Sequence, residues 1–441
     1  MGRRHLRGDL VKPWPWLIAL VTLLTITRLI TVSRLNDDPF AGDVDDGRGL
    51  VFADGRDTSK DAWLDQLVKE WNNTHSASHE VRFVQLPTTT DEHRAQLVAH
   101  AQDPLLAEED DAAKRRSECY DVVTLDLIWT HEFAASGYIV PLEESKFPTD
   151  AILDRALDSA RFDGELWAVP MRTDAALLYY RTDLLRQEGL SPPTSWEQLR
   201  TQAKQLATKY GLHGYVGQFD KYEGFTAGVV EAIHGAAGDI PPDADGVELF
   251  GSDAAERGMR RIIDGFAEQW IPHKAARFRE EEARQDFQDG KAVFMHNWPY
   301  AYQVMRHDQK SRVKDAFDVA PLPVPSVLGG WNLAVSECSV NRRLAYEFIN
   351  FLLREKTQES MFRKAGFAPA LESLYTKQEL LDEFPYLSVL KRGLDAAVNR
   401  PASPSYVQVT RAIQMNLHPT LINAPGSLPS SLAALLREID P

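Results

Sequence analysis

The sequence lacks the short motifs that identify several common enzyme classes. It has no G-x-S-x-G nucleophile motif, no phosphate-binding loop and no G-x-G-x-x-G dinucleotide fingerprint. His131-Glu132 is not followed by a second histidine at the spacing of a zinc protease. No local pattern selects a catalytic pair among the 64 acidic residues, so a glycosidase stays open without being favoured. We therefore expect no catalytic residue, no metal ligand and no cofactor.

Cysteine is nearly absent, since only Cys119 and Cys338 occur. No cysteine precedes Cys119, which excludes an N-terminal cysteine that carries a lipid anchor. The two residues show no metal-ligand spacing. They could form one disulfide outside the cytoplasm, although the sequence alone does not bring them together.

Positive charge is scarce beyond the first 35 residues. Those residues carry six Lys or Arg and one acid, a net charge of +5, so the whole-chain charge of −15 leaves −20 for the rest. Such an acidic body argues against nucleic acid or an anionic substrate as partner. With 441 residues, 44% hydrophobic and 26% charged, the chain is long enough for two globular domains.

The N-terminal segment, residues 1–35, has the pattern of an export signal. Four basic residues precede the apolar run 17–26, and Arg28 interrupts the apolar character before it resumes. No convincing small-x-small cleavage site follows, so we expect an uncleaved anchor that tethers an extracytoplasmic protein to the membrane. Residues 36–49 are acidic and polar and are expected to form a linker.

Strand-like and helix-like segments alternate along the rest of the chain. We expect strands at 50–53, 80–86, 121–127, 215–219, 291–295 and 329–335, and helices at 58–72, 91–102, 129–136, 195–210, 223–234, 254–270 and 342–354. This alternation predicts mainly parallel sheets, whose ligand-binding groups gather beyond the carboxyl ends of the strands. Asp126 lies at such an end.

Residues 162–181 predict a crossing between two α/β units. One apolar run ends at Pro170 and another begins at Ala175, with Arg172, Thr173 and Asp174 between them. Ligand-binding clefts often form at such junctions.

Several aromatic residues stand beside glycine, proline or acidic residues instead of inside apolar runs: Trp298, Tyr300, Trp331, Tyr222 and Tyr406. Sugars offer an apolar face for stacking and hydroxyl groups for carboxylate or guanidinium partners, so an acidic cleft with tryptophans suits a neutral carbohydrate. Core packing is the commoner role for any one of these aromatic residues.

Six segments together resemble a known family: DVVTLDLIW (121–129), GELWAVP (164–170), TDAALLYYR (173–181), KYEGF (221–225), NWPYA (297–301) and GGW (329–331). In this order they are similar to the bacterial extracellular sugar-binding proteins of ABC importers, solute-binding protein family 1, in the trehalose- and maltose-binding branch. The resemblance runs from about residue 50 to the C-terminus.

This resemblance implies a two-lobed periplasmic-binding-protein fold of the α/β class. Each lobe would hold a mainly parallel sheet flanked by helices, with the ligand cleft between the lobes. Residues 50–165 and 322–367 would form lobe I, and residues 166–321 and 368–441 lobe II. The chain would be a monomer that binds a disaccharide such as trehalose or maltose and delivers it to permease subunits in the membrane, with no enzymatic activity.

By the same resemblance, the ligand-binding residues would come from both lobes. Lobe I would supply Arg94, Asp126, Gly330 and Trp331, and lobe II or the hinge would supply Asp174, Tyr222, Glu223, Trp298, Tyr300, Arg400 and Tyr406. Arg172 departs from the family pattern, which has a smaller or aromatic residue there. The acid expected after the first strand is either Asp57 or Asp61. A membrane-anchored glycosidase and a sugar sensor for a signalling partner are the alternative functions.

Overall fold

The computed structural model describes residues 40, 43, 47–57, 59, 62–106, 118–236, 249–250 and 252–423. Contacts between residues divide the chain into two units, residues 1–43 and 44–441. The described helices and strands all belong to the second unit. The expected anchor, most of the linker and Asp61 lie outside the described residues. Among the helices that are described, none is both long and apolar enough to cross a membrane.

A five-stranded sheet forms the first lobe, in the order β2-β1-β3-β11-β6. Its strands are β1 (Leu50–Gly55), β2 (Val81–Leu86), β3 (Val122–Asp126), β6 (Val169–Ala175) and β11 (Leu328–Val335). β1 is parallel to β2 and β3, whereas β11 is antiparallel to β3 and β6. The central strands are buried along their length, as expected for strands covered by helices on both faces.

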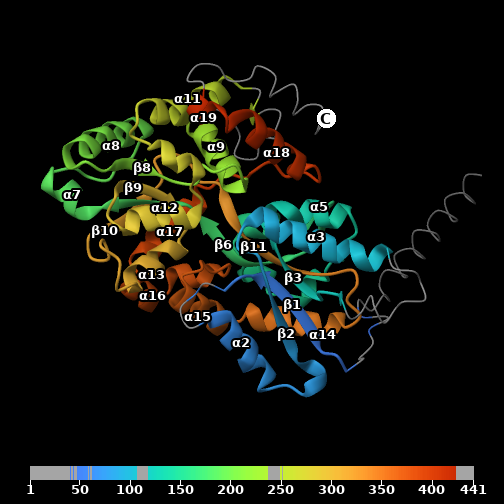
Figure 1. The fold of residues 1–441 in the computed structure, drawn as a ribbon. Helices are drawn as coiled ribbons and strands as arrows, with labels where there is room; N and C mark the ends of the chain where they lie inside the picture. The colour runs from blue at the N-terminus through green and yellow to red at the C-terminus, as the bar shows by residue number, and fades with distance from the viewer. Residues whose placement is uncertain are drawn as a thin grey trace, which may run out of the picture. The chain divides into compact units, whose positions relative to one another are not determined.

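Helices cover both faces of this sheet (Figure 1). They include α2 (Trp63–Asn72), α3 (Thr90–Leu106), α5 (Thr130–Ala135), α14 (Arg342–Leu352) and α15 (Glu355–Ala365). Trp63, Leu67 and Trp71 recur every four residues on α2 and are all buried. The Trp71 ring meets the edge of Phe348 on α14, with 5.3 Å between ring centroids. This aromatic contact ties the two helices together on one face of the sheet.

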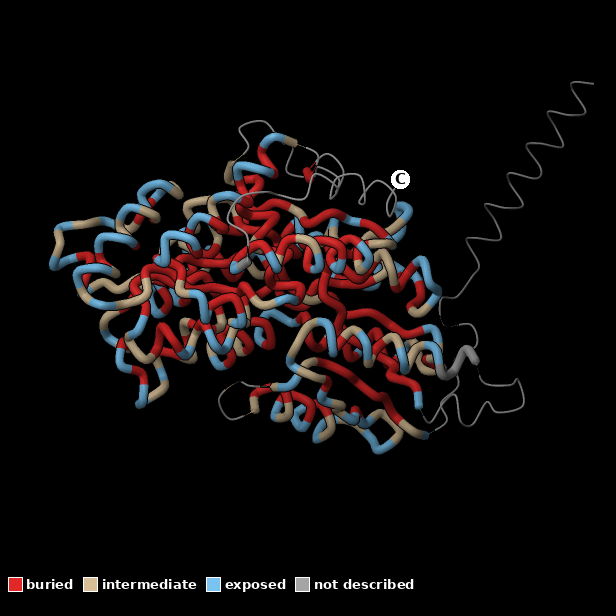
Figure 2. Tube along the Cα trace, turned by 45° about the horizontal axis from the view of Figure 1, so that its top comes forward, coloured by how far each residue is buried: buried red, intermediate tan, exposed pale blue. Residues whose placement is uncertain are grey.

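A four-stranded sheet forms the second lobe, in the order β10-β7-β9-β8. Its strands are β7 (Leu177–Arg181), β8 (His213–Val216), β9 (Ala292–Asn297) and β10 (Phe317–Pro321). Surrounding helices include α7 (Thr182–Gln187), α8 (Trp196–Tyr210), α9 (Glu223–Ala236), α11 (Asp253–Ala267), α12 (Glu280–Gln288), α13 (Tyr300–His307), α16 (Gln378–Glu383), α17 (Tyr386–Asp395), α18 (Tyr406–Leu417) and α19 (Thr420–Asn423). Figure 2 shows the buried segments gathered along the strands and the inner sides of helices.

The two-lobed α/β fold is confirmed, but the sheets are mixed and not mainly parallel. In the second sheet only β8 and β9 are parallel, and β7 is antiparallel to both β9 and β10. The cause is the crossing between lobes. β7 and β11 each begin where the chain arrives from the other lobe, so they run opposite to neighbours whose carboxyl ends face that lobe.

The crossing itself differs in position from the sequence expectation. Arg172, Thr173 and Asp174 do not interrupt the strand, because they lie within β6 and pair with β11. The chain leaves the first sheet at Ala176, whose N–H donates to Ser326 Oγ (2.8 Å). The expected boundary at 165/166 lies before β6, whereas strand pairing places β6 in the first sheet. Pro170 is tolerated there because β6 is an edge strand.

Cys119 and Cys338 form a disulfide, with 5.9 Å between their Cα atoms. It joins the residues just before β3 to the turn that follows β11. Adjacent antiparallel strands bring these two positions together, although they are 219 residues apart in the sequence. A disulfide of this kind is typical of proteins that fold outside the cytoplasm.

Candidate ligand-binding site

A cavity of about 490 Å³ lies where the two sheets approach each other. Its walls include the carboxyl end of β3, the start of β11 and the first turns of α9 and α12. Carboxyl ends of strands and amino ends of helices present polar groups without a partner in their own element, so both suit ligand binding. Eight of the eleven residues expected from the sequence line this cavity: Asp126, Asp174, Glu223, Trp298, Tyr300, Gly330, Trp331 and Arg400.

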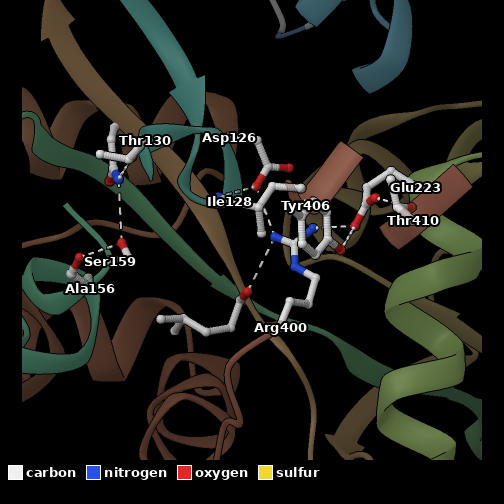
Figure 3. Close-up of polar contacts among 11 residues, drawn as sticks. Asp126, Ile128, Thr130, Ala156, Ser159, Glu223, Arg400, Tyr406 and Thr410 are labelled. Carbon is white, nitrogen blue, oxygen red and sulfur yellow. Dashed lines mark hydrogen bonds and ion pairs between the residues drawn. The ribbon is translucent and has the colours of Figure 1, made fainter. Parts of the chain in front are cut away.

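Arg400, a residue of the cavity wall, lies between Asp126 of the first lobe and Glu223 of the second (Figure 3). Its Nη2 donates to Asp126 Oδ1 (2.8 Å) at the end of β3, and its Nη1 donates to Glu223 Oε1 (2.8 Å) at the start of α9. The Arg400 residue is only 5% exposed, so both ion pairs are largely shielded from water. A shielded arginine with a carboxylate on each side fixes their positions relative to each other.

Glu223 is held by a second set of donors on α18. The Tyr406 hydroxyl donates to Glu223 Oε1 (2.6 Å), and Thr410 Oγ1 donates to Oε2 (2.7 Å). Burial raises the pKa of Glu223 to about 7, and the Arg400 guanidinium opposes that shift. Tyr406 therefore acts on the cavity by orienting Glu223, because its own side chain does not line the cavity wall.

Arg172 forms a second buried ion pair, on the first-lobe side. Its Nη2 donates to Asp54 Oδ1 (3.0 Å), and its Nη1 lies 3.3 Å from Asp54 Oδ2. The Arg172 Cζ atom lies 5.1 Å from the ring centroid of Trp331 and 4.8 Å from that of Phe367. Thr124 Oγ1 also donates to Asp54 Oδ1 (2.6 Å). Arg172 is thus fixed in the wall of the cavity.

His93 supports the same wall. Its ring lies 4.9 Å from that of Trp331, and Nε2 donates to the Thr124 carbonyl oxygen (3.2 Å). Burial lowers the pKa of His93 to about 4, so the ring is neutral at physiological pH. Trp331 therefore has Arg172 and His93 as neighbours, which leaves less of its ring for a ligand.

Gly329 and Gly330 let this wall form at the start of β11. Gly330 has a φ of +135°, and a Cβ atom there would lie 2.3 Å from the Arg172 carbonyl oxygen. No side chain fits such a close approach between β11 and β6. At Gly329, a Cβ atom would lie 3.0 Å from the Trp298 ring. The missing side chain allows the indole of Trp298 to lie against the strand.

Trp298 forms the second-lobe wall, directly after β9. The Tyr179 hydroxyl donates to the Trp298 carbonyl oxygen (2.7 Å), and the Trp298 N–H donates to Asn297 Oδ1 (2.8 Å). Tyr300 begins α13 and its hydroxyl donates to Glu281 Oε1 (2.8 Å) on α12. These bonds fix the backbone of Trp298 and the ring of Tyr300.

Asp174 differs from the other acids of the inner wall. Its carboxylate makes no ion pair or hydrogen bond with any residue that the structure describes. Burial raises the pKa of Asp174 to about 6, with Arg172 lowering it and Asp126 raising it. A carboxylate with no protein partner in a cavity wall has its hydrogen-bonding capacity left for a ligand.

Three expected residues do not line the cavity. Arg94 Nε donates to Glu132 Oε2 (2.8 Å), and its Nη2 also pairs with that carboxylate, so the guanidinium is engaged on the surface of the first lobe. Tyr222 is buried beside the cavity, with Arg279 Cζ 5.0 Å from its ring centroid. Tyr406 contacts Glu223 as described above.

Sequence reasoning also missed part of the wall. Asp54, His93, Phe367 and Arg279 line the cavity, and none was expected there. Asp54 lies near the carboxyl end of a buried strand, as Asp126 does. Its position at a strand end could therefore have identified it from the sequence. Between the two candidates after β1, Asp57 lines the cavity, and its Oδ2 accepts from the Leu64 N–H at the start of α2 (2.7 Å).

Comparison with known proteins agrees with this architecture. Residues 107–383 match the family described as bacterial extracellular solute-binding protein. A probable ABC transporter-binding protein of Deinococcus radiodurans is 30% identical over 400 residues, covering 86% of this chain and 89% of that protein. The maltose-bound T. maritima MalE3 has 27% identity and a TM-score of 0.77, over 89% of this chain and 98% of that one.

A binding protein of Arthrobacter globiformis for cyclic alpha-maltosyl-1,6-maltose shares the fold at 19% identity and a TM-score of 0.67, over 89% of this chain and 97% of that one. The fold has two lobes, with a cavity lined by polar and aromatic residues at their junction. The family match covers more than half of the sequence. The chain belongs to the bacterial extracellular solute-binding proteins, the binding components of ABC transporters.

Proposed function

We propose that the protein binds a disaccharide such as trehalose or maltose outside the cytoplasm and delivers it to the permease subunits of an ABC importer. The observation that carries this proposal is the cavity wall, which combines the aromatic residues Trp298, Tyr300 and Trp331 with the acids Asp126, Asp174 and Glu223. Aromatic rings stack against the apolar faces of sugar rings, and carboxylates accept hydrogen bonds from their hydroxyl groups. The likeness to maltose-bound T. maritima MalE3 supports a maltose-sized ligand.

The cavity volume is consistent with a small ligand. At about 490 Å³ it falls within the range of pockets that take drug-sized molecules, and it is bounded by residues from both lobes. Asp126 and Gly330 belong to the first sheet, while Glu223 and Trp298 belong to the second lobe. A ligand held by both sets of residues bridges the lobes.

The direct test is a thermal-shift screen of purified protein against disaccharides, monosaccharides and sugar alcohols. A ligand present at 100 times its dissociation constant stabilises the folded protein by about 2.7 kcal/mol, which is a clear shift in melting temperature. We expect trehalose or maltose to give the largest shift. A shift with a monosaccharide alone would reassign the ligand, and release of glucose from the disaccharide would favour a glycosidase.

We further propose that residues 1–35 tether the protein to the cell membrane through an uncleaved apolar segment. The basic residues before the apolar run 17–26 and the absence of an early cysteine support a protein tether over a lipid. Intact mass and membrane fractionation test this. A mature N-terminus near Asp37 would show that the segment is removed.

A further inference from the structure

The charges of the cavity do not balance. Among the residues that the structure describes, nine carboxylate side chains line it against five guanidinium groups, and none of the lining residues is a lysine. The two arginines without an ion pair to a described residue, Arg56 and Arg277, are exposed at the rim. The inner wall therefore carries excess negative charge, which disfavours an anionic ligand and favours a cationic one.

Most of the lining carboxylates already have partners in the protein. Four of them pair with arginines of the cavity, Glu281 pairs with Arg284, and Asp57 and Glu282 accept backbone N–H groups at helix starts. The four arginine-paired acids are Asp54 with Arg172, Asp126 and Glu223 with Arg400, and Asp220 with Arg279. Asp174 and Glu280 remain, since neither forms an ion pair with a residue that the structure describes.

Both of these acids lie close to the Trp298 indole. Asp174 Cβ and the Trp298 ring both lie against Gly329, within 3.4 Å of the position that a Cβ atom would occupy there. Glu280 lies beside the Trp298 and Tyr222 side chains at the start of α12. An aromatic ring with carboxylates close by can bind an ammonium group, through charge and through the ring quadrupole.

A neutral sugar would leave the negative charge of Asp174 and Glu280 without a positive partner. Its hydroxyl groups can donate hydrogen bonds to Asp174 and Glu280, but they bring no positive charge into a site from which the ligand excludes water. A buried carboxylate without a cation must either stay charged at a cost or take up a proton. A ligand with an ammonium group supplies both the hydrogen-bond donor and the charge.

We propose that the physiological ligand is a saccharide that carries a protonated amine, and that its ammonium group lies on the Trp298 indole close to Asp174 and Glu280. This inference rests on the proposed function, because it assigns a chemical class to the ligand of the same cavity. Arg172, Asp126, Tyr179 and Tyr375 are the other charged or titratable groups near Asp174. Of these, only Arg172 is cationic, and Asp54 already pairs with it.

The test is calorimetry with matched ligands: trehalose, maltose and their amino-deoxy derivatives, each with one amine at a different ring carbon. We expect at least one derivative to bind about tenfold or more tightly than its parent sugar at pH 7.5. In the N-acetylated form of that derivative the nitrogen is an uncharged amide that cannot be protonated, so this form should lose the gain. Between pH 7.5 and 5 the affinity for the derivative should fall as Asp174 becomes protonated.

Two variants locate the effect. Asp174→Asn keeps the size of the side chain and should remove most of the preference for the amine and most of its pH dependence, and Glu280→Gln should reduce the same preference. Glu379→Gln, an exposed site on α16 outside the cavity, removes the same charge from the protein and should leave the preference intact.

The outcomes separate the two proposals. If the parent sugars bind and no derivative binds more tightly, or if Asp174→Asn retains the full preference, the ammonium assignment is wrong and the sugar-binding function stands. If neither sugars nor amino sugars bind the folded wild-type protein, both proposals fail.

Discussion

Asp174 shows how the burial of one carboxyl group can limit stability. Its carboxyl group has a pKa of about 6 because burial disfavours the charged form, whereas an exposed aspartate has a pKa near 3.8. The folded pKa is raised, so the favourable contribution of the protonated form is complete below pH 3.8 and is lost as the pH rises through 6. At pH 8 the folded protein contains an ionised Asp174 with no cation of its own.

We therefore predict that Asp174→Asn stabilises the unliganded protein at pH 8 by about 1–3 kcal/mol, because the amide has no charge to desolvate. The gain should shrink as the pH falls and vanish near pH 4, where Asp174 is protonated in the wild type. Chemical denaturation at pH 4, 6 and 8 measures this. An equal gain at all three values would mean that the charge of Asp174 is not its cause.

Trp298 and Trp331 have different surroundings and should respond differently to substitution. Trp298 lies over Gly329 on the second-lobe wall, while the Trp331 ring already contacts Arg172 and His93. We predict that Trp298→Ala weakens sugar binding by about 2 kcal/mol or more, as expected for a central aromatic contact. Trp298→Phe should retain most of the affinity, because an aromatic face remains.

Calorimetry on correctly folded variants provides the measurement. Trp331→Ala should weaken binding as well, but it also removes a partner of Arg172 and should lower thermal stability. Unchanged affinity in Trp298→Ala would place the sugar elsewhere in the cavity.

At the scale of secondary-structure elements, the disulfide adds a covalent link to strands that already pair. Cys119 and Cys338 close a loop of 219 residues between the residues before β3 and the turn after β11. Cross-linking a loop of this size restricts the unfolded chain and stabilises the fold by about 5 kcal/mol in the chain-entropy model. We predict that a reductant lowers the melting temperature of the wild type.

The matched control is the double variant Cys119→Ser with Cys338→Ser. It should melt at the temperature of the reduced wild type and should not respond to the reductant. Equal melting temperatures for the oxidised and reduced wild type would show that β3 and β11 hold this region without the bond.

Most elements were predictable from local sequence patterns, because the apolar spacing of a helix or strand depends on near neighbours. The helix expected at 223–234 is α9 (Glu223–Ala236), and the strand expected at 121–127 is β3 (Val122–Asp126). Strand direction was not predictable in this way. The direction of a strand relative to its neighbours depends on which lobe the chain comes from. The residue patterns of β7 and β11 do not indicate that lobe.

The candidate site shows the same division. Asp126, Glu223 and Trp298 stand at element ends, where polar and aromatic residues are informative, and all three line the cavity. The pairs that complete the wall depend on distant contacts, since Arg172 and Asp54 are 118 positions apart. The engagement of Arg94 by Glu132, on the surface of the first lobe, likewise has no local signature.

At the scale of the whole molecule, the central question is how ligand binding couples to the movement of the lobes. Asp126 belongs to the first sheet and Glu223 to the second lobe, and Arg400 pairs with both. The lobes are therefore linked by protein contacts at Arg400, and under the proposed function a sugar would add further contacts between them. A ligand shifts such an equilibrium only by its difference in affinity for the open and closed forms.

We predict that the wild type becomes more compact in X-ray scattering when its sugar is added, and that Asp174→Ala needs about ten to a hundred times more sugar for the same change. The reason is the loss of a charge-assisted hydrogen bond, which is worth roughly 1.5–3 kcal/mol.

Asp126→Ala should need a similarly higher sugar concentration, but it should also melt at a lower temperature without ligand, because Arg400 loses one of its two buried partners. Glu379→Gln serves as the control and should follow the wild type. If both aspartate variants become as compact as the wild type at the same sugar concentration, these carboxylates do not provide the ligand contacts that join the lobes. The closing contact would then be expected at Glu223 or at Trp298.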